Sequence, residues 1–129
     1  MKRLIILVIC SLFANVLFAQ AIQKITSVEA QVILSGLDSK TSVIIDGRDS
    51  VMFYSGHIKD AIYIDAFENN AKNFLLKYLD KENIVVYCTM NKRSEKIIEM
   101  LKSMGYQGEI IYISDGISGW KENNFPVEK

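Results

Sequence analysis

The chain has 129 residues, half of them hydrophobic, and its 15 basic residues balance its 15 acidic ones. This length suits one compact domain and leaves no room for a second. The balanced charge argues against a nucleic acid or an anionic membrane surface as a partner.

Residues 1–19 have the pattern of a secretory signal peptide. Lys2 and Arg3 precede an apolar run from Leu4 to Phe18, and small residues follow at the expected cleavage site. The run is shorter than the roughly 20 residues that span a bilayer as a helix. We therefore predict cleavage and an exported domain of residues 20–129, periplasmic or secreted, without stable membrane insertion. An uncleaved amino-terminal anchor is the alternative.

Cleavage would leave one cysteine in the mature chain. Residues 1–19 contain Cys10, two basic residues and no acidic residue, so their loss leaves Cys88 alone and a net charge of −2. A lone thiol in an oxidising compartment is an apolar filler, a partner for another molecule, or a reactive group. The neighbours of Cys88 must decide between these roles.

Short apolar runs alternate with amphipathic stretches along the mature chain. Runs typical of buried strands lie at residues 22–25, 43–45, 61–64, 84–87 and 110–113. Helical stretches are predicted from Thr26 or Ser27 to Gly36, from Asp49 to Gly56, from Phe67 to Leu79, from Ser94 to Gly105, and in a short turn bearing Trp120. Within the third stretch, an apolar stripe at helical spacing comprises Ala71, Phe74, Leu75, Tyr78 and Leu79. This order predicts an α/β fold with a central, mainly parallel five-stranded sheet and helices on both faces.

Cys88 directly follows the fourth predicted strand, at the edge of the sheet where ligands of such folds bind. Residues 89–92 then form a loop before Arg93 and the predicted helix start at Ser94. A helix amino terminus offers unpaired N–H groups and partial positive charge, which favour an anion. With Lys92 and Arg93 nearby, the thiol should ionise more readily than a free cysteine and act as a nucleophile.

Three ordered segments resemble the rhodanese superfamily. The segment Cys88–Arg93 is similar to its active-site loop. Asp46–Arg48 and Gly56–Ile58 resemble its amino-terminal Asp-x-Arg strand end and Gly-His-Ile turn. Gly119–Trp120 and Pro126–Val127 resemble its carboxyl-terminal ending. The matches therefore cover nearly the whole predicted mature domain.

This resemblance implies a sulfurtransferase. Cys88 would carry a persulfide, moving a sulfane sulfur from thiosulfate or a persulfide donor to a thiol or cyanide, or to a protein acceptor. No cofactor is implied, and no cluster of Cys and His indicates a metal. The N–H groups after the cysteine would hold the outer sulfur. The predicted substrate-binding residues are Thr89, Met90, Asn91, Lys92, Arg93 and Arg48.

Three positions depart from the family pattern. Asn91 stands where many relatives have glycine, and asparagine tolerates the left-handed backbone conformation better than most residues. Gly47 replaces the usual apolar residue between Asp46 and Arg48, and Asp60 stands where glycine is common. These departures concern the acceptor pocket more than the fold.

The sequence leaves the roles of several polar residues open. Arg93 would either bind the substrate anion or brace the loop through carbonyls. Arg48 is predicted to pair with Asp46 or Asp49, although the resemblance places it close to the site. For His57, the only histidine, we predict a structural hydrogen-bonding role.

Two other functions fit parts of the same pattern. One is phosphatase chemistry, but related phosphatases have a loop one residue longer and a histidine where Tyr87 precedes the cysteine. Arg93 lies five positions after Cys88 here, which suits one sulfur better than a tetrahedral oxyanion. The other is a non-catalytic binding or sulfur-relay module that acts on a protein partner.

Overall fold

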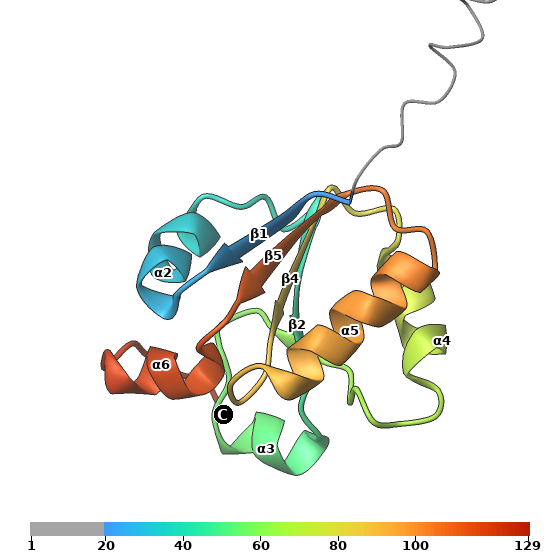
Figure 1. Cartoon of the computed structure of the whole chain (residues 1–129). Coiled ribbons are helices and arrows are strands. Elements are labelled where there is room, and N and C mark those ends of the chain that lie inside the picture. Colours follow the sequence, from blue (N-terminus) through green and yellow to red (C-terminus); the bar gives the residue numbers. More distant parts are fainter. Residues whose placement is uncertain (1–19) are drawn as a thin grey trace, which may run out of the picture.

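Five parallel strands form the centre of the domain, in the spatial order β1-β5-β4-β2-β3. The computed structural model describes residues 20–129, so the predicted signal peptide and Cys10 lie outside the described residues. The strands are β1 Ile22–Ile25, β2 Ser42–Asp46, β3 Ile62–Tyr63, β4 Asn83–Tyr87 and β5 Glu109–Ile113. In Figure 1 their carboxyl ends point the same way, so the loops that follow them meet at one edge.

Helices cover both faces of this sheet, which confirms the predicted fold class (Figure 1). One face packs against α4 (Ala71–Leu75), the following 3₁₀ helix η2 (Leu76–Tyr78) and α5 (Lys92–Ser103). The other packs against α2 (Ser27–Ser35), α3 (Ser50–Ser55) and α6 (Gly116–Glu122). Within the described residues, no helix is both long and apolar enough to cross a membrane.

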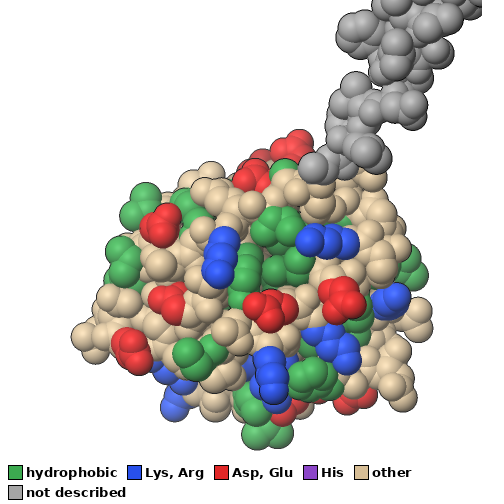
Figure 2. All heavy atoms as spheres, in the orientation of Figure 1, with side chains coloured by type: hydrophobic (Ala, Val, Ile, Leu, Met, Phe, Trp, Pro, Cys, Tyr) green, Lys and Arg blue, Asp and Glu red, His purple; other side chains and the backbone are tan. Residues whose placement is uncertain are grey.

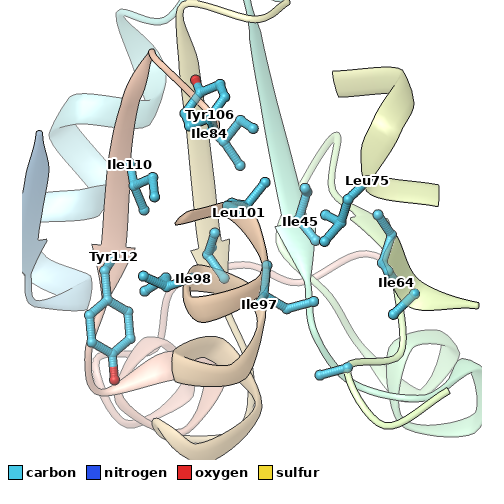
Figure 3. Packing of buried hydrophobic residues seen from close by; sticks show 13 residues of the cluster. Ile45, Ile64, Leu75, Ile84, Ile97, Ile98, Leu101, Tyr106, Ile110 and Tyr112 are labelled. Atoms are coloured by element: carbon cyan, nitrogen blue, oxygen red, sulfur yellow. The ribbon is translucent and has the colours of Figure 1, made fainter. Parts of the chain in front are cut away.

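The central position of β4 follows from its side chains. Ile84, Val85, Val86 and Tyr87 are all fully buried, as expected of a strand with cover on both faces. Ile84 and Val86 pack among the residues under α4 and α5, which Figure 3 shows in part, while Val85 and Tyr87 belong to the opposite cluster. The residue after β4 therefore emerges at the middle of the carboxyl edge.

Local capping explains where two helices begin. Thr26 and Glu29 form a reciprocal capping box at the start of α2, and the Asp49 side chain accepts a hydrogen bond of 2.8 Å from the Met52 amide at the start of α3. Gly36 and Gly56 end these helices as predicted.

Three predicted elements differ in extent from the structure. The third strand is only Ile62–Tyr63, because β3 is an edge strand that pairs with β2 over these two residues. The third helical stretch forms five α-helical residues and then tightens into η2, so Ala71 and Leu75 are buried while Phe74 is exposed. The helix predicted from Ser94 begins at Lys92 instead.

Asp60 has a φ of 66°, in the left-handed region that favours glycine. This position is one of the departures from the family pattern noted above. Aspartate is one of the few other residues that enter this region at modest cost. The turn before β3 therefore keeps the backbone of a glycine turn with a different side chain.

Candidate active site

Cys88 lies between the end of β4 and the start of α5, and its thiol is free. Its side chain is 1% exposed, and Sγ accepts a hydrogen bond of 3.3 Å from the backbone amide of Ser94. This amide belongs to the first turn of α5, where N–H groups lack intrahelical acceptors. The sulfur therefore sits at the positive end of the helix dipole.

The loop after Cys88 leaves further donors unused. Within residues 20–129, the amides of residues 89–93 donate no hydrogen bond to protein acceptors. Thr89, Met90, Asn91 and Lys92 are exposed, so the loop faces solvent. This arrangement brings together the sulfur and the amides expected to hold an outer sulfur atom.

Asn91 does not use the left-handed conformation that its glycine-like position suggested. Its φ is −139°, a value open to any residue, so the tolerance of asparagine for left-handed angles is not needed here. The loop turns into α5 without a left-handed residue at this point. Replacing glycine by asparagine here therefore imposes no left-handed strain.

The amino end of α6 holds the loop from the opposite side. The amides of Ile117 and Ser118 donate hydrogen bonds of 2.8 and 3.1 Å to the carbonyls of Cys88 and Thr89. Gly116 has a φ of 58°, and a Cβ atom at this position would collide with both carbonyl oxygens. Local sequence does not indicate this contact, because Cys88 lies 28 positions before Gly116 in the chain.

Arg93 lies against an aromatic ring. Its Cζ is 5.0 Å from the centroid of the Phe67 ring, and Lys96 Nζ is also 5.0 Å from that centroid. Arg93 Nε is buried without a hydrogen-bond partner. Bracing through loop carbonyls is therefore not seen within residues 20–129, and anion binding by Arg93 stays a prediction. The sequence analysis missed Phe67 as a support for Arg93, because Phe67 was assigned to a helical stretch.

Arg48 forms a buried ion pair with Asp46. The shortest contact, Nη2 to Oδ2, is 2.7 Å, and Nη2 also donates to the Gly56 carbonyl at 2.8 Å. Burial alone would lower the pKa of Arg48, but the hydrogen bonds and charge of Asp46 outweigh it and raise the pKa above its usual value. The predicted pairing with Asp46 is confirmed. Direct contact of Arg48 with a substrate stays a prediction, and the ion pair occupies much of its hydrogen-bonding capacity.

The turn that contains His57 is fixed by several bonds. The hydroxyl of Tyr87 accepts from the Ile58 amide at 3.0 Å, and burial holds the pKa of Tyr87 well above its usual value. The His57 ring stacks on Phe53 at 3.8 Å, and Nδ1 lies 3.0 Å from the Phe53 carbonyl. The backbone of His57 also pairs with Glu128. His57 thus has the structural role that was predicted.

A cavity on the described part of the chain is separate from the thiol. It measures about 430 Å³ and its lining includes Asp49, Asp65 and Glu68 but neither Cys88 nor residues 89–93. Carboxylates would repel an anionic donor, so cavity size does not indicate the reactive site here. Among residues 20–129, no group of three or more His, Cys, Asp or Glu side chains is placed to hold a metal ion.

Comparison with known proteins gives a consistent result. Residues 29–123 match the model of the Rhodanese-like domain family. The chain is 29% identical over 108 residues to a tRNA uridine(34) hydroxylase of Buchnera aphidicola. This matched region covers 78% of this chain and 33% of that protein. The chain spans less than half the length of the curated relatives that it matches.

Two solved structures show the same fold. A rhodanese-related protein from Thermoplasma volcanium has a TM-score of 0.65 and 24% identity, covering 81% of this chain and 96% of its own. A thiosulfate sulfurtransferase from Pseudomonas aeruginosa has a TM-score of 0.66 and 21% identity, covering 82% of this chain and 20% of its own.

Replacing Gly116 with Ala should destabilise the domain by about 3 kcal/mol, for two reasons. A residue with a Cβ atom costs about 1–2 kcal/mol in the left-handed conformation, and the new Cβ also collides with the loop. Gly105→Ala is the matched control, since Gly105 has a φ of 77° but open space around it. Gly105→Ala should lower the free energy of unfolding by the left-handed penalty alone. Urea denaturation of both variants measures the difference. Equal losses would show that Gly116 does not support the loop through close contact.

Proposed function

Because this chain belongs to the rhodanese-like domain family, we propose that it is a sulfurtransferase that carries a sulfane sulfur on Cys88. The observation that carries this proposal is the contact of 3.3 Å between Cys88 Sγ and the Ser94 amide, next to the unused amides of residues 89–93. This geometry suits a sulfur that bears negative charge and gains a second sulfur atom. The loop and α5 would supply the stabilisation, with no cofactor.

In the first step, the Cys88 thiolate attacks the outer sulfur of thiosulfate. The bond between the two thiosulfate sulfurs breaks, sulfite leaves with the bonding electrons, and Cys88 becomes a persulfide. A persulfide donor would react in the same way and release a thiolate. The unused amides of residues 89–93 are the donors available to the outer sulfur.

In the second step, a thiolate or cyanide attacks the outer sulfur. The bond between this atom and Sγ breaks, and its electrons return to Sγ as the Cys88 thiolate. The product is a new persulfide or thiocyanate. The Ser94 amide, already 3.3 Å from Sγ, would stabilise the leaving thiolate.

A second candidate is a sulfur-relay module that delivers its persulfide to one protein partner. The favouring observation is Met90, an apolar side chain on the loop that is 57% exposed. Flexible methionine side chains are common at protein-binding surfaces. This function shares the first chemical step and differs in the acceptor.

Full-length protein that has been reduced, freed of the reductant and then incubated with thiosulfate should gain the mass of one sulfur atom, because the Cys88 thiolate takes up the outer sulfur. Intact mass spectrometry measures the gain. Cyanide should discharge it and form thiocyanate, and Cys88→Ala should show neither reaction.

Loading that cyanide and small thiols discharge only slowly would favour the relay module. Absence of loading from both thiosulfate and a persulfide donor would refute sulfur transfer. Hydrolysis of an aryl phosphate that depends on Cys88 would point to phosphatase chemistry instead.

Lys92 and Arg93 are proposed to attract the anionic donor. Figure 2 shows basic and acidic side chains interspersed on the face that bears α5, so the attraction would be local. Lys92→Met and Arg93→Met should each raise the KM for thiosulfate about 3- to 10-fold, with a smaller effect at high salt because ions screen the charges. Lys102→Met, near the other end of α5, is the control. Unchanged KM values in both site variants would contradict this role.

We also propose that the protein is exported, on the basis of the signal pattern in residues 1–19. Expression in a bacterium and sequencing of the mature amino terminus tests this. A chain that begins near Gln20 in the exported fraction is expected. A membrane-bound chain that retains residues 1–19 would support the uncleaved anchor.

A further inference from the structure

Two buried hydroxyl groups, on a residue that contacts the thiol and on the strand beside β4, have no hydrogen-bond partner among residues 20–129. They are Ser94 Oγ, in a residue that is 0% exposed, and the Tyr112 hydroxyl, in a residue that is 6% exposed. Leaving a buried hydroxyl without a partner costs about 1–3 kcal/mol. Such groups are therefore candidates for binding something that forms only during function.

Ser94 is in direct contact with the sulfur. Its backbone amide donates to Cys88 Sγ at 3.3 Å, and its buried hydroxyl is carried by the Cβ atom of the same residue. Ser94 is in the first turn of α5. A small rotation about its single side-chain torsion changes the direction of this hydroxyl without moving the helix.

Tyr112 approaches from the neighbouring strand. It pairs with Val86 on β4, and the side chains of Val86 and Tyr112 both lie on the α5 face of the sheet. Cys88 follows Val86 by two positions, and its Sγ contacts the first turn of α5. Figure 3 shows the Tyr112 ring extending past the carboxyl end of β5, with its hydroxyl beyond the packed aliphatic side chains. The hydroxyl therefore points toward the edge where Cys88 lies.

The electrostatics agree with this position. Burial raises the pKa of Tyr112 to about 12, with further contributions from the negative charges of Glu95 and Cys88 and from the Glu95 carboxylate close to the hydroxyl, although no hydrogen bond of good geometry joins the two side chains. Tyr112 thus keeps its proton at neutral pH and remains a hydrogen-bond donor.

Tyr106 provides an internal comparison. It belongs to the same apolar cluster, but its hydroxyl donates to the Lys81 carbonyl at 2.8 Å, and Figure 3 shows it at the opposite end of the sheet. Burial, followed by the charge of Glu109, raises its pKa to about 12 as well. Tyr106 is therefore a buried tyrosine with its hydroxyl satisfied by structure, and Tyr112 is not.

We propose that the hydroxyls of Ser94 and Tyr112 donate hydrogen bonds to Cys88 Sγ when this sulfur is negatively charged. The proposal rests on the sulfur-transfer function above and assigns its departing thiolate a pair of donors. When the acceptor takes the outer sulfur, the bond to Sγ breaks and its electrons stay on Sγ. Both hydroxyls keep their protons and turn toward this charge, which stabilises the transition state for discharge.

Single-turnover discharge of the loaded persulfide to cyanide tests the kinetic part. Tyr112→Phe and Ser94→Ala should each slow discharge about tenfold, the usual effect of losing one hydrogen bond to a charged group. Tyr106→Phe and Ser103→Ala are matched controls, because their hydroxyls bond to the carbonyls of Lys81 and Met100. The controls should discharge at the wild-type rate.

Titration of the thiolate separates this inference from the proposed function. The ultraviolet absorbance of the Cys88 thiolate is followed against pH, with each variant referenced to the same variant carrying Cys88→Ala. Loss of a donor disfavours the thiolate, so the midpoint should move to higher pH in Tyr112→Phe and Ser94→Ala but not in the controls. The charged groups on the surrounding elements are the same in all variants: Asp46 at the end of β2, Arg48 after it, Lys92, Arg93 and Glu95 on α5, and Asp115 before α6.

The outcomes are distinct. Unchanged midpoints and discharge rates in both site variants would overturn the two-donor proposal, even if wild-type protein transfers sulfur. If wild-type protein loads no sulfur, the proposed function fails, and the thiolate midpoints still decide whether the two hydroxyls bind the charged sulfur.

Discussion

The site depends on one junction, where the central strand β4 ends and α5 begins. A strand buried on both faces must deliver its next residue at the middle of the sheet edge, and the helix that follows must start with unpaired amides. Cys88 occupies this junction, and its Sγ accepts from the Ser94 amide. The fold therefore places a thiol against positive backbone groups before any side chain contributes.

The surrounding turns keep this junction in place. On one side, Gly116 allows α6 to approach closely enough to bond the carbonyls of Cys88 and Thr89. On the other, the Asp46–Arg48 ion pair and the Tyr87 hydroxyl fix the turn that contains His57. Breaking a buried ion pair by removing one partner typically costs about 3–5 kcal/mol, so such a pair holds one arrangement of the turn. The groups whose hydrogen bonds are satisfied thus fix the backbone around the Cys88 junction.

The unsatisfied groups lie where charge would change during sulfur transfer. In the part of the chain that the structure describes, no hydrogen-bond partner is found for the amides of residues 89–93, the Arg93 Nε atom or the hydroxyls of Ser94 and Tyr112. Groups held ready in this way need little reorganisation when a negative charge develops, because the fold has already oriented or confined them. The same contrast distinguishes Tyr112 from Tyr106, two buried tyrosines of one cluster.

The sequence by itself determined the elements and the position of Cys88 between a strand and a helix, because these depend on near neighbours. Periodicity predicted five strands and the helices between them, capping residues such as Asp49 marked helix starts, and the order strand, Cys88, loop, Arg93, helix predicted an anion-binding thiol. Edge pairing and tightening shortened β3 and α4, since these effects depend on tertiary neighbours. Only the tertiary structure decided that Phe67 supports Arg93, that Gly116 touches the loop, and that Tyr112 comes beside Cys88. Each of these contacts joins residues more than 20 positions apart, and local pattern carries no information about which distant side chains the sheet brings together.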